Sequence, residues 1–351
     1  MEPVADLVPL FVKEFELCAV HEGELVALLT EPRTRPEYVG AAGAAALALG
    51  DEVFEIAVRG QGWQGTPFAG RAGMSVPALT YPTRLLDVVR DTLSRADFVV
   101  DLVPDTIIHR PLRDELKQAG ARILTICEPP DALERMFPTP EVTAEVIALR
   151  DRLAAASRLH AGSEGGTDLS FDLSSAIANG QKGFVDEPGT WDHWPSALVT
   201  GYPDDDTARG TWVLSPGDVV LPFNRFVEAP VELCIEAGFI EEITGGLDAD
   251  ILRDYLGGFG DREVFRTSHV GFGVHPAAQW NALSFYDRRE TMGMDARCFR
   301  GGFLCSTGPN RCTGRYVDAH LDIPMRGCTV TLDDQVVLDA GRLVGAGAPI
   351  G

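Results

Sequence analysis

Two hydrophobic periods alternate along the first 150 residues, and this alternation constrains the fold more than any other feature of the sequence. Short apolar runs of strand type are separated by longer segments in which apolar residues recur with the helical period. Strands that alternate with helices are typical of parallel β-α-β units, which predicts an α/β domain with a mostly parallel sheet. The expected strands are residues 24–30, 53–58, 98–103 and 123–126, and the expected helices are residues 36–49, 85–94 and 112–118.

A long helix is predicted at residues 141–160, where the chain would leave this first domain. Its apolar side chains recur at spacings of three or four positions, which places them on one helix face. The members of this stripe are Val142, Val146, Leu149, Leu153 and Ala156.

From Ser163 onward the sequence consists of short apolar segments separated by Gly, Pro and Asp, which favours antiparallel sheet. Strands are expected at residues 211–214, 219–222, 231–235 and 239–243, with one helix at residues 248–256. We therefore predict an α/β domain over residues 1–160 and a β-rich α+β domain over residues 161–351, which carries the metal site and the catalytic centre.

The composition of the chain excludes some classes of partner. A formal charge of −22 argues against binding to nucleic acid or to an anionic membrane, because both are polyanions. No secretory signal peptide is evident at the N-terminus, and the longest small apolar run, residues 39–49, is too short to span a bilayer. Seven cysteines without a Cys-x-x-Cys spacing fit reduced thiols. The prediction is a cytoplasmic protein.

The segment around His320 and Asp322 carries the clearest chemical signal. Two side chains that are two positions apart on an extended segment point to the same side, so this imidazole and this carboxylate are expected to face one another. His269, in the segment SHVGFG, is the candidate for a second imidazole. Two histidines and one carboxylate form the ligand set of many non-haem Fe(II) oxygenases. The alternative is an ordinary hydrogen-bonded histidine beside a surface aspartate.

Two further histidines are candidates for acid-base chemistry. His193 lies between Trp191 and Trp194, a setting that can stack a planar ring beside a proton acceptor, although a packed loop histidine explains it equally well. His109 follows a predicted strand at the sheet edge where open α/β sheets bind ligands, although it can also simply precede a helix.

A glycine-rich segment at residues 60–65 (GQGWQG) matches the dinucleotide-binding fingerprint letter for letter. That fingerprint should open a helix, but Pro67, Gly70 and Gly73 follow it, and the acidic residue expected about twenty positions later is missing. We interpret this segment as a flexible loop, and no dinucleotide cofactor is predicted.

Several segments of the chain together resemble the 2,5-dihydroxypyridine 5,6-dioxygenase family. They are residues 191–196 (WDHWPS), 268–273 (SHVGFG), 303–310 (FLCSTGPN) and 320–326 (HLDIPMR). The resemblance, which extends over nearly the whole chain, implies opening of the 2,5-dihydroxypyridine ring by O2 to give N-formylmaleamate, a step of nicotinate and nicotine catabolism. It implies Fe(II) held by His269, His320 and Asp322.

The resemblance also implies roles for other residues of this chain. His193 and His109 would orient the substrate and take a proton from a ring hydroxyl, and Ser306 would contact the bound ring or dioxygen. Members of the family often assemble into homo-oligomers, which is the expectation for this chain.

This family is distantly related to the two-metal aminopeptidases of the thermophilic type, which supply the alternative function. Those enzymes resemble the chain around Gly271 and Gly273 but carry a glutamate where His269 stands, and they need further Glu, His and Tyr ligands that we do not find here. A non-catalytic small-molecule binder that keeps the fold is a third hypothesis.

Overall fold

The structure, a computed structural model, describes residues 4–58, 83–104, 107, 111–221, 223–288 and 290–344. These residues form two compact units, each with its own core. The first unit contains the described residues up to Pro138 together with Gly183–Ser196, and the second contains Thr139–Lys182 and the described residues from Ala197 onward. The glycine-rich segment at residues 60–65 and the candidate His109 lie outside the described residues.

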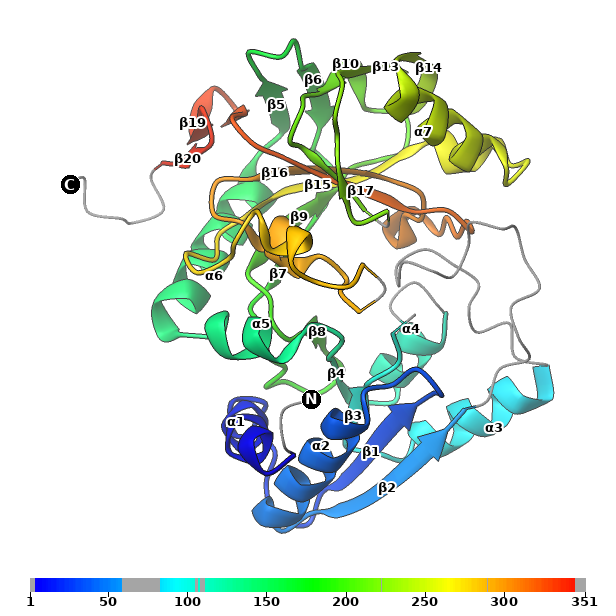
Figure 1. Ribbon diagram of the computed structural model, residues 1–351, viewed down its shortest axis with the longest axis vertical. Coiled ribbons are helices and arrows are strands. Elements are labelled where there is room, and N and C mark those ends of the chain that lie inside the picture. Colours follow the sequence, from blue (N-terminus) through cyan, green and yellow to red (C-terminus); the bar gives the residue numbers. More distant parts are fainter. Residues whose placement is uncertain are drawn as a thin grey trace. The chain divides into compact units, whose positions relative to one another are not determined.

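The first unit is built on a five-stranded parallel sheet with the order β2-β1-β3-β4-β8 (Figure 1). Its strands are β1 (Leu25–Thr30), β2 (Glu52–Ala57), β3 (Phe98–Asp101), β4 (Arg122–Thr125) and β8 (Trp191–His193). Its helices are α1 (Val4–Leu17), α2 (Pro36–Leu49), α3 (Thr83–Leu93), α4 (Pro111–Gln118) and α5 (Pro130–Arg135). The prediction of a parallel α/β layer is confirmed.

Helices cover both faces of this sheet, and for that reason its inner strand β1 is a nearly continuous apolar run. Val26 and Leu28 of β1 belong to the same buried cluster as residues of α1 and α2, whereas Ala27 and Leu29 belong to a second cluster with residues of α3 and α4. Successive side chains of a strand point to opposite faces, so a sheet with two covered faces needs continuous hydrophobic runs.

The outer strand β8 was not expected from the sequence. It lies far along the chain from β4 but pairs with it in parallel, with Thr125 opposite His193. The predicted division at residue 160 therefore differs from the observed units, because the chain leaves the first unit after Pro138 and later returns to it for Gly183–Ser196. This return places His193 at the carboxyl end of a parallel strand.

The second unit contains two antiparallel sheets, as the short apolar segments predicted (Figure 1). The larger sheet has the order β14-β13-β10-β6-β5-β18-β19-β20, the smaller one has the order β17-β16-β15-β9-β7, and β11 and β12 form a separate pair. The strands are β5 (Arg158–Gly162), β6 (Asp168–Asp172), β7 (Ile177–Gln181), β9 (Leu198–Tyr202), β10 (Arg209–Leu214), β11 (Val219–Val220), β12 (Arg225–Phe226), β13 (Val231–Glu236), β14 (Phe239–Gly245), β15 (Thr267–Gly273), β16 (Phe303–Thr307), β17 (Leu321–Met325), β18 (Thr329–Leu332), β19 (Gln335–Asp339) and β20 (Arg342–Leu343).

The helices of the second unit are α6 (Pro140–Ala155), α7 (Leu247–Gly257) and α8 (Met294–Cys298), with 3-10 turns at Arg262–Phe265, Ala282–Ser284 and Arg311–Thr313. The predicted apolar stripe of α6 is buried in the core that the two sheets share. The predicted end of this helix at His160 was wrong, because the helix stops at Ala155 and β5 follows from Arg158. Among the described residues, no helix is both long enough and apolar enough to cross a membrane.

Candidate metal centre

Strands β15 and β17 of the smaller sheet, with one strand between them, bring the three predicted ligands together. His269 lies on β15, Asp322 lies on β17, and His320 directly precedes β17. Strand β16 lies between β15 and β17 and places Ser306 opposite Asp322. The Asp322 backbone is also paired with Leu221 through hydrogen bonds of 2.9 and 3.0 Å. Sheet pairing therefore fixes the backbone of Asp322, and with it the origin of the carboxylate side chain, from both sides.

The side chains of His269, His320 and Asp322 converge on one point, as the sequence predicts. Their possible ligand atoms all lie within 4.8 Å of one another. Nε2 of His269 is 3.4 Å from Oδ1 of Asp322, and Nε2 of His320 is 3.2 Å from Oδ2. All three residues are buried, with exposed fractions of 6, 2 and 3%. Two imidazole nitrogens and one carboxylate oxygen in this arrangement can hold a divalent transition-metal ion.

A β-bulge sets the direction of the His269 side chain. The register between β15 and β16 shifts between Thr267 and Val270, so that Ser268 and His269 together face Ser306. The Ser306 hydroxyl donates to the carbonyl of His269 and accepts from its backbone N–H, each at 2.8 Å. Bulges commonly re-aim a side chain next to a functional site. Here one hydroxyl replaces the ladder hydrogen bonds that the bulge removes.

The hydrogen bond of His320 determines which of its ring nitrogens faces the other ligands. Nδ1 lies 2.7 Å from the carbonyl oxygen of Thr307. A carbonyl oxygen only accepts, so Nδ1 carries a proton, and Nε2 is the nitrogen that faces Asp322. A backbone acceptor on the second ring nitrogen is the usual way in which proteins orient a metal-binding histidine.

Arg297 is the residue of this centre that sequence reasoning missed. It comes from the short helix α8, and its Nε donates to Oδ2 of Asp322 at 2.7 Å. Its Nη1 donates to the carbonyl of Met292, and both side chains of the Arg297–Asp322 pair are almost fully buried. Oδ1 of Asp322 has no hydrogen-bond partner in the part of the chain that the structure describes. This buried oxygen is therefore the one that is available to a metal ion.

The electrostatic environment keeps the ligands in the protonation states that bind metals. Burial lowers the pKa of His269 to about 4, so its imidazole is neutral near pH 7. Burial alone would raise the pKa of Asp322, but His320 and Arg297 outweigh it and hold this pKa well below the ordinary value. Metal binding needs neutral imidazole and ionised carboxylate. His269 and Asp322 satisfy this requirement.

Comparisons with known proteins agree with this site. The sequence model of a family described as 2,5-dihydroxypyridine 5,6-dioxygenase matches residues 6–345. The chain belongs to the 2,5-dihydroxypyridine 5,6-dioxygenase family. It is 39% identical over 355 aligned residues to a 2,5-dihydroxypyridine 5,6-dioxygenase of Pseudomonas putida, with 97% of this chain and 96% of that protein covered.

Two solved structures are similar to this chain, one from the same dioxygenase family and one more distant. The structure of 2,5-dihydroxypyridine dioxygenase from Pseudomonas putida KT2440 superposes with a TM-score of 0.92 at 38% identity and covers 98% of this chain and 99% of that chain. Wild-type AmpT from Thermus thermophilus superposes with a TM-score of 0.64 at 16% identity, covering 97% of this chain and all of the other. At that level of identity the likeness to AmpT shows the fold alone, and the comparisons do not favour the aminopeptidase hypothesis.

The remaining predicted site residues lie in different parts of the family fold. His193 is buried at the end of β8 in the first unit, with its ring 4.9 Å from that of Trp191, so it is a packed residue of a strand. Ser306 lies beside the cluster of His269, His320 and Asp322 in the second unit, where its hydroxyl donates to the carbonyl of His269. The catalytic roles of His193, His109 and Ser306 stay predictions.

Proposed function

We propose that this protein is a mononuclear Fe(II)-dependent dioxygenase that opens the ring of 2,5-dihydroxypyridine with O2. The bond between C5 and C6 of the ring is cleaved, and both atoms of O2 enter the product, N-formylmaleamate. One observation carries the proposal: in a chain of this family, His269, His320 and Asp322 form a buried cluster whose ligand atoms lie within 4.8 Å of one another.

The ligand residues match the needs of ferrous iron. Two neutral imidazoles and one carboxylate form a donor set typical of non-haem Fe(II) and leave coordination positions for other ligands. Bound there, the iron would supply the electron transfer between the electron-rich ring and O2 that neither can carry out directly. The burial of all three ligands supports a site from which bulk water is excluded.

The protein itself must hold the ring and accept a proton from one of its hydroxyl groups. His193 is proposed for this task because its imidazole is buried beside the indole of Trp191 at the carboxyl end of a parallel strand, where α/β sheets commonly bind ligands. His109 is the second candidate for the proton acceptor. Ser306 is proposed to keep His269 oriented, in addition to its predicted contact with the ring or dioxygen.

The test is reconstitution of the metal-stripped protein with Fe(II) under anaerobic conditions, followed by addition of 2,5-dihydroxypyridine and O2. We expect one O2 consumed for each ring opened and one iron bound for each chain. His320→Ala and Asp322→Ala should lose both the iron and the O2 uptake. His160→Ala is the matched control, because this histidine lies on the surface of the same unit and pairs with the exposed Asp168.

Several outcomes would contradict the proposal. Absence of O2 uptake by the iron-loaded protein excludes the dioxygenase, and peptide hydrolysis with Zn or Co in its place would support the aminopeptidase alternative. Stoichiometric iron in both His320→Ala and Asp322→Ala would exclude the ligand assignment.

A further inference from the structure

The bulge on β15 raises the question of what holds His269 in place. A bulge interrupts the hydrogen-bond ladder of a strand, so the residues within it depend on bonds from outside the ladder. Ser306 supplies two of these bonds to the His269 backbone. The N–H and the hydroxyl of the neighbouring Thr267 donate to the carbonyl of Gly238, whereas the Thr267 carbonyl and the Ser268 hydroxyl are held by the connection between β16 and β17.

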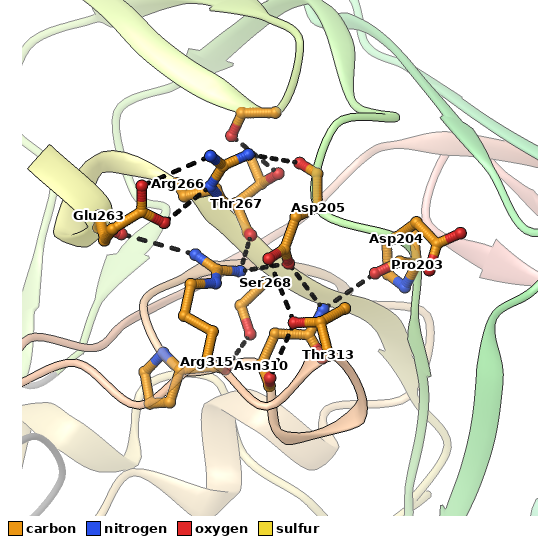
Figure 2. Close-up of polar contacts among 12 residues, drawn as sticks. Pro203, Asp204, Asp205, Glu263, Arg266, Thr267, Ser268, Asn310, Thr313 and Arg315 are labelled. Carbon is orange, nitrogen blue, oxygen red and sulfur yellow. Dashed lines mark hydrogen bonds and ion pairs between the residues drawn. The ribbon is translucent and has the colours of Figure 1, made fainter.

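That connection, residues 308–320, is gathered around one carboxylate, which Figure 2 shows. Oδ1 of Asp205 accepts from Arg315 Nη2 at 3.0 Å and from Asn310 Nδ2 at 3.1 Å. Oδ2 of Asp205 accepts from Thr313 Oγ1 at 3.1 Å. We call Asp205, Asn310, Thr313 and Arg315 the Asp205 cluster. Its one acidic member lies between β9 and β10, and its three donors come from the connection.

The Asp205 cluster is joined to the segment that carries His269. Besides Asp205, Arg315 Nη2 donates to the carbonyl of Thr267 at 2.7 Å, two residues before His269. The Ser268 hydroxyl, one residue before His269, donates to the carbonyl of Pro309, which lies next to Asn310 in the connection (Figure 2). The position of β15 at the bulge therefore depends on the connection.

The same connection ends at His320 and packs tightly against it. Gly308, which opens the connection, has a φ of +103°, and a Cβ added there would lie 2.1 Å from the Ala319 carbonyl oxygen and 2.9 Å from Cα of His320. The N–H of Gly308 donates to the carbonyl of Arg266 at 3.0 Å. The start and the end of the connection are thus in contact, and both lie beside β15.

We propose that Asp205 is a positioning residue of the metal centre, which fixes the spacing between His269 and His320 without touching either. The inference rests on the proposed metal-binding function. Asn310 is fully buried and Arg315 is 8% exposed, so these donors have little water to replace the carboxylate if it is removed. Loss of Asp205 leaves buried donors unsatisfied, and the connection must shift to satisfy them. Such a shift changes the distance between the imidazoles of His269 and His320.

The test is a titration of metal-stripped protein with Co²⁺, whose visible absorption reports the coordination geometry. Asp205→Ala should weaken the affinity for Co²⁺ by about 10-fold or more and should alter the absorption spectrum. Substitutions of residues that orient metal ligands have effects of this size in other metalloproteins. Asp205→Asn keeps one acceptor oxygen and should lie between Asp205→Ala and the wild type. The control is Asp204→Ala, because Asp204 is exposed, bonds to Ser175, and directs its carboxylate away from the cluster in Figure 2.

The outcomes separate this inference from the proposed function. If the wild type binds neither Co²⁺ nor Fe²⁺, both are wrong. If the wild type binds Co²⁺ and both Asp205 variants bind it with unchanged affinity and spectrum, only the positioning role is wrong. Should Asp205→Ala fail to fold, Asp205→Asn carries the test. A purely structural role predicts a lower unfolding temperature without metal but the same gain in unfolding temperature on adding Co²⁺.

Discussion

Removal of the Asp322 carboxylate should destabilise the protein even when no metal is bound. Arg297 and Asp322 form an ion pair at 2.7 Å, with side-chain exposures of 3 and 4%. Asp322→Asn leaves the guanidinium buried without a counter-charge. Loss of one partner of a buried pair typically costs about 3 to 5 kcal/mol, most of which is the penalty of an uncompensated charge. The free energy of unfolding of the metal-free variant should fall by this amount.

A second change should restore most of this loss. Arg297→Met by itself leaves the carboxylate without its guanidinium partner and should cost about as much as Asp322→Asn. In the double variant neither charge is present, so its loss in free energy of unfolding should be much smaller than the sum of the two single losses. We expect a coupling free energy of at least about 3 kcal/mol.

The assay is chemical denaturation of the wild type, the two single variants and the double variant, all after removal of metal. The control cycle uses Arg158 and Asp334 of the same unit, which pair at 3.0 Å but are 59 and 88% exposed. An exposed pair of this kind should give a coupling free energy below about 1 kcal/mol. Iron analysis of the same proteins after reconstitution with Fe(II) adds a second measurement, because neither variant that lacks Asp322 should bind iron.

Two results would refute the reasoning. A coupling free energy of Arg297 with Asp322 no larger than that of the exposed pair would mean that the buried guanidinium is not the charge partner of the ligand carboxylate. Restored stability together with stoichiometric iron in the double variant would mean that Asp322 is not a ligand.

Three further predictions concern single residues. His193→Ala should keep the iron and lose about 100- to 10,000-fold in turnover, the usual cost of a lost acid-base group, and a near-normal rate would reduce His193 to a packing residue. Ser306→Ala leaves two buried backbone groups of His269 unsatisfied and should lower the free energy of unfolding by about 1 to 3 kcal/mol, measured by denaturation, with a weaker affinity for iron; unchanged values of both would contradict its orienting role. Burial raises the pKa of Asp218 from 3.8 to about 6, so the folded state binds a proton more tightly than the unfolded state. This contribution to stability is fully present below about pH 4. The free energy of unfolding should fall by about 3 kcal/mol as the pH rises from 4 through 6. Asp218→Asn should remove this slope from a pH series of denaturation curves.

Much of the first unit follows from local sequence alone. The strands and helices between residues 24 and 126 were predicted within a few residues, because hydrophobic period and length distinguish them. Strand β8 could not be predicted in the same way. It is three residues long, and only its pairing with β4 makes it a strand. The position of His193 therefore depends on a contact between distant parts of the chain.

The candidate metal centre could also be predicted only in part from the sequence. That Asp322 and His320 face one another follows from their spacing on an extended segment, and His269 was chosen correctly as the third member of the cluster. The ion pair of Arg297 with Asp322 could not be predicted from the sequence, because a single arginine in a five-residue helix has no pattern to distinguish it. The same holds for Asp205, which is one of three consecutive aspartates in the sequence.

The sequence by itself determined the alternation of strands and helices, the change to antiparallel sheet, and the types of the three candidate ligand side chains. These features are local, because they depend on residue type and on spacing along a few turns or strands. The tertiary structure alone decided which strands are neighbours, where the bulge falls on β15, and which charges face Asp322 and the connection before His320. Those features depend on pairing and burial between segments far apart in the chain, and the free energy of such contacts leaves no periodic trace in the sequence.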